Sequence, residues 1–300
     1  RINFSFEAYY KRTSNMLMRV PESYTVTGEG YRWKNVGVMN NKGIELSADA
    51  DVIRTKDFTW NVSANVSYNQ NRLKELYNGV TEYVNSTTGL KYVVGHSVSE
   101  FFLNRYAGVN PANGEQLWYD KNGNVTNEFR ESDKVMTGKT YDAPWMGGFG
   151  TSFRWKGLQL SAQFSWIGTR YVINNDRYFE ESGVTFGTAY NQSRRVLYNR
   201  WKNPGDITDI PKWGEVNQLD DRYLENASFL RLKNLSLSYS LPQAWLSKTK
   251  FFTLVRIYAQ AQNLFTITGF NGLDPEVSSN VYRAQYPASR QFTLGMEVSF

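Results

Sequence analysis

Apolar and polar side chains alternate at every second position along five segments of this sequence. In the last of them, residues 290–300, Phe292 and Leu294 stand on either side of Thr293. The same pattern occupies residues 2–10, 43–53, 57–69 and 157–167. Because successive side chains of a β-strand point to opposite faces, each segment predicts a strand with one apolar and one polar face.

The length of these segments favours strands that cross a membrane. Segments 43–53 and 57–69 run for 11 and 13 residues, whereas strands of globular proteins average about 5–6 residues. The polar face of segment 57–69 carries small uncharged side chains such as Asn61 and Asn65, which suit a water-filled lumen. A transmembrane β-barrel therefore explains the pattern better than a soluble sandwich.

Weaker alternation predicts five further strands. They lie at about 100–109, 114–119, 146–155, 228–241 and 251–264. In segment 228–241 the leucines change from even to odd positions, which predicts a β-bulge near Lys233 and Asn234. We therefore expect an all-β fold of ten antiparallel strands that forms a single domain over residues 1–300.

The connections between these ten strands alternate in length. The short ones are 54–56, 110–113, 155–157 and 242–250, and the long ones are 11–42, 70–99, 120–145, 168–227 and 265–289. Outer-membrane barrels have short periplasmic turns and long outer loops. If the long loops are outside, the last strand runs inward and the C-terminus is expected in the periplasm.

The composition agrees with a barrel wall. Aromatic residues make up 16% of the chain, although its mean hydropathy is only −0.54. No stretch approaches the about 18–20 apolar residues of a helical membrane span. Tyr10, Trp155, Trp166 and Trp245 are expected in the aromatic girdles at the membrane interfaces. The chain begins directly in a strand pattern without a signal peptide, so we expect a mature fragment of a longer protein.

Charge and residue types argue against several other functions. The net charge of +6 comes from dispersed basic residues, so nucleic-acid binding has little support. Cysteine is absent, which excludes a disulfide scaffold and a zinc–thiolate site. The single histidine, His96, has no nucleophile motif around it and is expected to be a loop or lumen residue. We therefore predict no catalytic residue, no metal site and no cofactor.

The longest loop, 168–227, holds the candidate substrate contacts. Aromatic faces stack on sugar rings and carboxylates accept hydrogen bonds from hydroxyl groups, which points to Trp201, Trp213, Asp206 and Asp209. The alternative is that these residues pack the loop or contact a partner protein. Calcium binding by the loop carboxylates is disfavoured because their spacing matches no EF-hand.

Polar residues of two neighbouring strands are expected to face the lumen. They have odd numbers, opposite to the apolar residues, and are Asn61, Asn65, Asn69, Glu45 and Asp49. Lining the wall is the simpler role for them, and specific binding is the alternative.

Several segments resemble the SusC/RagA group of TonB-dependent outer-membrane transporters. Segment 41–45 reads NKGIE and is followed by the alternating strand 58–69. Segment 223–235 reads YLENASFLRLKNL, and segment 262–276 reads QNLFTITGFNGLDPE. The motifs follow one another in the family's order over nearly the whole chain.

This resemblance implies a fold and a function. The fold would be a 22-stranded barrel with an N-terminal plug, of which this chain forms about the last ten strands. The function would be import of oligosaccharides or peptides across the bacterial outer membrane, driven by TonB through an N-terminal region not present here. The partners implied are a SusD-like lipoprotein on the outer loops, the lipid bilayer, and a second transporter–lipoprotein pair in a dimer.

Three other functions fit parts of the pattern. A passive porin or adhesin barrel would have the same strands but no plug. A soluble carbohydrate-binding β-protein would be extracted without detergent. An outer-membrane hydrolase would depend on His96.

Overall fold

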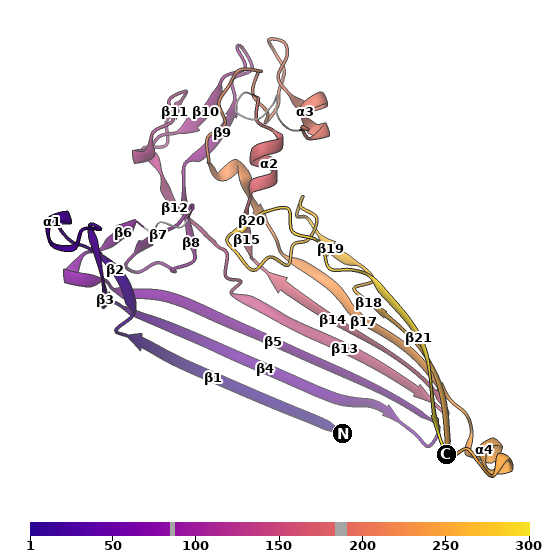
Figure 1. Ribbon diagram of the computed structural model, residues 1–300. Coiled ribbons are helices and arrows are strands. Elements are labelled where there is room, and N and C mark those ends of the chain that lie inside the picture. Colours follow the sequence, from indigo (N-terminus) through magenta and orange to yellow (C-terminus); the bar gives the residue numbers. More distant parts are fainter. Residues whose placement is uncertain (85–87, 184–190) are drawn as a thin grey trace.

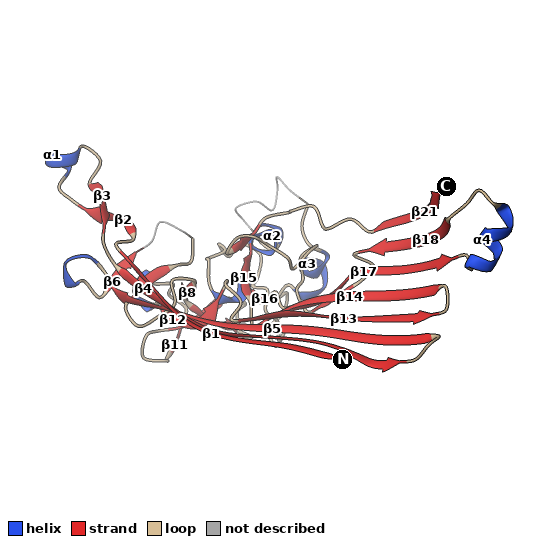
Figure 2. Cartoon of the chain, turned by 90° about the horizontal axis from the view of Figure 1, so that it is seen from below, coloured by secondary structure: helices blue, strands red, loops and turns tan. Residues whose placement is uncertain are grey.

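The long strands form one antiparallel sheet. The structure is a computed structural model that describes residues 1–84, 88–183 and 191–300. The strands of the sheet, in spatial order, are β1 (Ile2–Ser14), β4 (Val38–Arg54), β5 (Phe58–Glu75), β13 (Trp145–Trp155), β14 (Leu158–Gly168), β17 (Phe229–Ser240), β18 (Leu254–Gln262) and β21 (Gln291–Ser299). A short strand, β19 (Thr266–Thr268), pairs with β17. The predicted all-β antiparallel fold is confirmed, although the sheet is open between β1 and β21 (Figures 1 and 2).

Two of the ten predicted strands do not belong to this sheet. Segments 100–109 and 114–119 instead form β8 (Glu100–Leu103), β9 (Arg105–Val109) and β10 (Gln116–Tyr119), which lie in small separate sheets. β10 pairs with β9 and β11 (Val125–Thr126), and β8 pairs with β12 (Val135–Thr140). In chain order these two segments were expected between β5 and β13, but β13 pairs directly with β5. The expectation that all ten strands belong to the wall was therefore wrong, since within the described residues the sheet has these eight long strands and the short β19.

The alternation of loop lengths survives this correction. The connections are now short at 55–57, 156–157 and 241–253, and long at 15–37, 76–144, 169–228 and 263–290. The long ones emerge at one end of the sheet, while both chain termini and the helix α4 (Gln243–Thr249) lie at the other (Figure 1). Residues 85–87 and 184–190 of the predicted long connections lie outside the described residues.

The register gives the sheet two chemically different faces. Ala48, Ala64 and Phe149 are opposite one another on β4, β5 and β13, and so share one face. Ser47, Asn65 and Gly148 share the other face. The predicted bulge is also present, because Asn234 and Leu232 pair with consecutive residues of β14 and leave Lys233 out. The bulge restores the apolar face after the leucines change parity.

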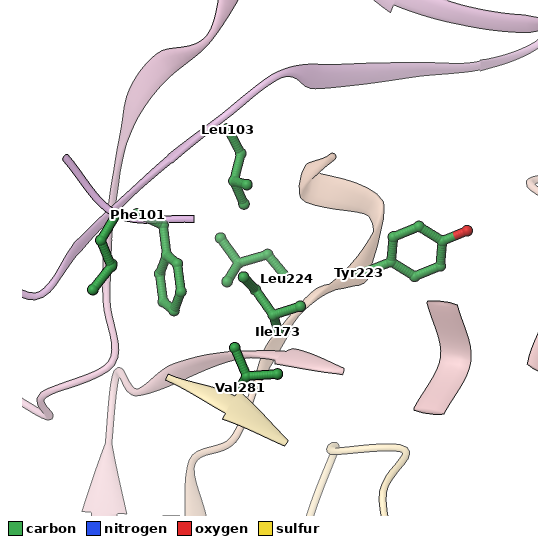
Figure 3. Close-up of a cluster of buried hydrophobic side chains, with 7 residues drawn as sticks. Phe101, Leu103, Ile173, Tyr223, Leu224 and Val281 are labelled. Carbon is green, nitrogen blue, oxygen red and sulfur yellow. The ribbon is translucent and has the colours of Figure 1, made fainter. Parts of the chain in front are cut away.

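The long connections fold into a layer of their own beyond the end of the sheet. We call the described parts of 76–144, 169–228 and 263–290 the loop cap. Its strands β15 (Tyr171–Asn174), β16 (Leu224–Asn226) and β20 (Val281–Tyr282) form one sheet, and the helix α2 (Asn175–Glu180) contacts β20. The helix α3 (Arg194–Asn199) follows α2 in the same connection. Buried apolar residues from all three connections pack together in its centre, among them Phe101, Ile173 and Val281 (Figure 3). The cap therefore has a hydrophobic core separate from the barrel wall.

A smaller unit stands at the outer ends of β1 and β4. The strands β2 (Leu17–Pro21) and β3 (Tyr31–Asn35) form a hairpin closed by the helix α1 (Tyr24–Thr27). Beside it lie two parts of the loop cap, the 3₁₀ turn Tyr77–Gly79 and the hairpin of β6 (Glu82–Val84) and β7 (Lys91–Val93). Further 3₁₀ turns occupy Glu131–Asp133 and Asp221–Tyr223. Across the described ranges, no helix has the length and apolar character needed to span a membrane.

The two faces of β5 give a direct test of the membrane orientation. Ala64 and Ser63 are small, exposed neighbours that point to opposite faces near the middle of the strand. Replacing a lipid-facing residue with Arg at mid-membrane costs about 2–4 kcal/mol. We expect Ala64→Arg of the full-length protein to unfold at clearly lower urea concentration in vesicles, and Ser63→Arg to behave like the parent. Equal loss in both variants would contradict the assignment of the faces.

Candidate functional site

The polar face of the sheet holds a concavity of about 480 Å³. Its lining comes from β1, β4, β5, β13, β14 and β17, and includes Glu45, Asn65 and Ser165. Glu276 reaches it from the loop cap. Two of the five predicted lumen residues thus line a single hollow whose walls offer carboxylate, amide and hydroxyl groups. Such groups can hydrogen-bond a polar solute.

The other three predicted lumen residues share this face but lie elsewhere along it. Asn61 donates to Asp51 at 3.2 Å near the end with the short turns. Asp49 is opposite Ser63 at mid-strand. Asn69 accepts from the Tyr9 hydroxyl at 3.2 Å near the loop cap. The five residues therefore form one polar stripe rather than one binding site, and whether the stripe faces a lumen stays a prediction.

An ion pair ties the loop cap to this face. The side chain of Arg231, on β17, is almost fully buried and donates to Glu276 at 2.7 Å and to Asp274. Lys233, the bulge residue, donates to Glu276 as well, at 2.7 Å. The two carboxylates belong to the segment Asp-Pro-Glu, 43 and 45 positions after Arg231 along the chain. We call these four residues the wall anchor.

Asp274 is held in its charged form. Burial alone would raise the pKa of this carboxyl group, but hydrogen bonds from the amides of Ala288 and Glu276, both at 2.9 Å, and the charge of Arg231 outweigh it. The net result is a lowered pKa. The carboxylate therefore closes its own loop and binds the wall at the same time.

A second network of charges holds the loop cap together internally. Arg177 of α2 donates to Glu225 at 2.7 Å and to Glu181 at 3.1 Å. Arg195 of α3 bridges Glu181 and Asp209. Asp209, predicted to contact substrate, is therefore engaged with the loop itself.

A third cluster joins connection 76–144 to connection 169–228. The fully buried carboxylate of Asp220 accepts from the Trp118 indole at 2.8 Å and from Arg222 at 3.3 Å. Burial raises the pKa of Asp220, against the lowering effect of the Arg222 charge. The guanidinium of Arg222 also covers the ring of Tyr106, whose pKa burial raises to about 12.

The remaining predicted substrate contacts differ in their surroundings. Asp206 accepts from the amides of Lys202 and Asn203, both at 2.9 Å, and so caps a tight turn. The Trp201 indole donates to the Pro111 carbonyl at 3.2 Å. Trp213 is 56% exposed, with the Arg200 guanidinium over its ring. Of the two predicted tryptophans it has the more exposed aromatic surface, and substrate contact by the four residues stays a prediction.

His96 lies in the loop cap near the end of β5. Its Nδ1 atom is 3.0 Å from the buried carboxylate of Glu100, which also accepts from the Gly138 amide at 2.8 Å. Both side chains border a polar hollow of about 440 Å³ that includes Arg72. Within the described ranges, no group of three His, Asp or Glu side chains is arranged to hold a metal ion.

The sequence analysis missed the wall anchor. Its signal in the sequence was a cation, Arg231, on the polar side of an alternating strand. Both halves of the anchor nevertheless lie in segments that carried the family resemblance, 223–235 and 262–276. The ion pair between Arg231 and the two carboxylates therefore explains physically why both motifs occur together in this chain.

Residues 1–264 match the family model described as TonB dependent receptor-like, beta-barrel. This chain belongs to that family. Among curated relatives, it is 29% identical to the TonB-dependent receptor SusC of Bacteroides thetaiotaomicron and 28% identical to the TonB-dependent receptor P3 of Formosa agariphila. The alignments cover 100% of the chain but only 30% and 32% of those proteins.

Solved structures give the same assignment. The RagAB peptide importer in its open-open state superposes with a TM-score of 0.92 at 37% identity, covering 100% of this chain and 33% of that one. The closed-closed state gives a TM-score of 0.91. The resemblance to SusC and RagA is therefore confirmed, and the chain spans about a third of the length of these TonB-dependent relatives.

The wall anchor predicts how the receptor responds to loss of Arg231. Removing one partner of a buried ion pair costs about 3–5 kcal/mol because the other charge is left unpaired. We expect Arg231→Met in the full-length protein to release residues 269–289, seen as faster amide hydrogen exchange there. Lys233→Met removes a more exposed cation worth under about 1 kcal/mol and serves as the control. Unchanged exchange in Arg231→Met would contradict the anchor.

The lowered pKa of Asp274 predicts the pH range of the anchor. A carboxyl group whose folded pKa lies below its unfolded value, about 3.9, stabilises the fold above that value and loses the effect as pH falls through the folded pKa. We expect protection of residues 269–289, corrected for intrinsic exchange rates, to stay constant from pH 7 to 5 and to fall below about pH 4. In Asp274→Asn this acid transition should disappear. A transition at pH 5–6 would contradict the assignment.

Proposed function

We propose that the full-length protein is a TonB-dependent importer of oligosaccharides or peptides in the bacterial outer membrane. The observation that carries the proposal is the two-faced sheet, apolar on one side and hollowed and polar on the other, in a chain of this receptor family. An apolar outer face suits lipid and a polar inner face suits a solute path. The C-terminus would then be periplasmic, on the side of the short turns.

The substrate class rests on weaker support. The structures with 37% identity are called those of a peptide importer, which favours peptides. The exposed ring of Trp213 and the amide-rich polar stripe would serve sugars or peptides equally. Both classes therefore belong to the proposal.

The same proposal assigns the partners. A SusD-like lipoprotein would bind the loop cap. The buried charge networks of the cap hold its loops in one conformation and so preform the binding surface. TonB would act through the N-terminal region that this chain does not contain. Two transporter–lipoprotein pairs would form a dimer. No step requires a cofactor or covalent chemistry.

The decisive experiment uses the full-length native protein. It is purified in mild detergent, and copurifying proteins and bound small molecules are identified by mass spectrometry. We expect a lipoprotein and a bound glycan or peptide, and uptake of that solute by cells should stop when TonB is deleted. Uptake that continues without TonB would replace this function with that of a passive porin.

The exposed ring of Trp213 gives a test at residue level. Loss of one stacking surface should weaken binding of the identified solute or of the lipoprotein about five- to tenfold in Trp213→Ala, since an aromatic contact contributes about 1 kcal/mol or slightly more. The control variant Leu197→Ala also removes an exposed apolar side chain of the same connection, 62% exposed, and should bind normally. Equal affinity in both variants, measured by calorimetry, would remove Trp213 from the contact surface.

A further inference from the structure

Basic side chains gather at the outer end of the apolar face. On β1, β4 and β5 the residues of this face have even numbers, and most are apolar from residue 2 to 8, 44 to 50 and 58 to 66. Towards the loop cap the same rows continue as Arg12, Lys42 and Arg72. We call these three residues the rim cations.

The register brings the rim cations together. Arg12 and Arg72 flank Asn40 on its two sides, and Lys42 lies one step lower on the middle strand. With strands about 4.8 Å apart, the backbones of Arg12 and Arg72 are about 10 Å from each other. All three residues are exposed. Their charged ends can therefore reach one group outside the sheet.

Carboxylates are absent from these rows. The even positions 2–14, 38–50 and 58–72 hold no Asp or Glu, whereas Glu7, Glu45 and Asp49 all project to the polar face. Glu75 approaches Arg12 at 3.8 Å, but both side chains are more than half exposed, so the pair is weak. Arg72 uses one N–H group on the Gly95 carbonyl. Among the described residues, no carboxylate pairs with Lys42.

Arg12 and Arg72 lie just beyond the aromatic border of the apolar face, and Lys42 lies level with it. Tyr10 pairs directly with Lys42, one same-face position before Arg12, and Tyr68 lies two same-face positions before Arg72. Tyrosine marks the level where lipid tails meet headgroups. Lys and Arg side chains beyond that level extend towards the headgroups while their stems stay on the apolar surface.

We propose that the rim cations bind the phosphate groups of glycolipids in the outer leaflet. Charge complementarity and continuity with the lipid-facing surface both support this ligand. Arg and Lys bind phosphate through charge-assisted hydrogen bonds. The proposal rests on the orientation given in the proposed function, with the long loops outside, because only then does the rim meet the glycolipid leaflet.

The test measures binding of monophosphoryl lipid A to the full-length protein in detergent by native mass spectrometry. Each cation near an anionic lipid surface contributes a factor of about five in affinity. The variant Arg12→Gln/Lys42→Gln/Arg72→Gln should therefore bind about a hundredfold more weakly. The control Lys11→Gln/Arg54→Gln/Lys56→Gln removes the same charge from the polar face and the opposite end, and should bind normally.

Three outcomes would overturn the proposal. The first is equal binding by the triple variant and the parent protein, and the second is equal binding of lipid A with its phosphate removed. Competition by inorganic phosphate alone at millimolar concentration would also do so, since it would show a free-anion site. Orientation is checked separately: because this chain contains no cysteine, Asn122→Cys adds one thiol to it, and its labelling on intact cells with an impermeant maleimide is compared with that of the parent protein. If Asn122→Cys is labelled but the triple variant binds lipid A as the parent protein does, only this inference is wrong. If Asn122→Cys is not labelled, the orientation given in the proposed function is wrong.

Discussion

The structure depends on pairing the backbone groups of the long strands with one another. Lipid tails offer no hydrogen-bond partner, so an N–H or C=O group in the membrane must be satisfied within the protein. This requirement explains why β5 pairs with β13 along the whole length of β13, passing over 69 intervening residues from 76 to 144. Continuous pairing also fixes the register. The register in turn keeps apolar and polar residues on opposite faces along the middle of the strands, and the bulge at Lys233 preserves this separation on β17.

The loop cap follows a different rule because water is available there. Its strands are short and fall into several small sheets, and many of its links are made by side chains. Buried charges such as Arg177 with Glu225, or Asp220 with Arg222, are each matched by an opposite charge or a good donor. Buried ion pairs add little net stability, but leaving one partner alone is costly. They therefore select one arrangement of the long connections rather than simply stabilising the cap.

The sequence predicted the wall well and the cap poorly, for one physical reason. A strand such as 57–69 repeats its two-residue period many times, so its type and its faces follow from local pattern alone. Segments 100–109 and 114–119 show the same period too briefly to reveal whether they join the wall. In the structure β9 and β10 pair with each other and β8 pairs with β12, all outside the long sheet. Residue type identified Asp206 and Asp209 as polar loop groups, but their actual partners lie at Lys202 and Arg195. The partner of each carboxylate depends on the folded loop and cannot be read from residue type.

The wall anchor joins the long-stranded sheet to the loop cap, and its chemistry follows from its position between them. Arg231 projects from β17 on the polar face. If the contact with segment 269–289 were apolar instead, separating the two would expose apolar surface to water. An ion pair with Asp274 and Glu276 avoids that cost, because each partner is readily hydrated when separated. Glu276 borders the 480 Å³ hollow and Asp274 closes the loop above it. The same interaction therefore sets the position of the cap and supplies part of the surface that a solute would meet.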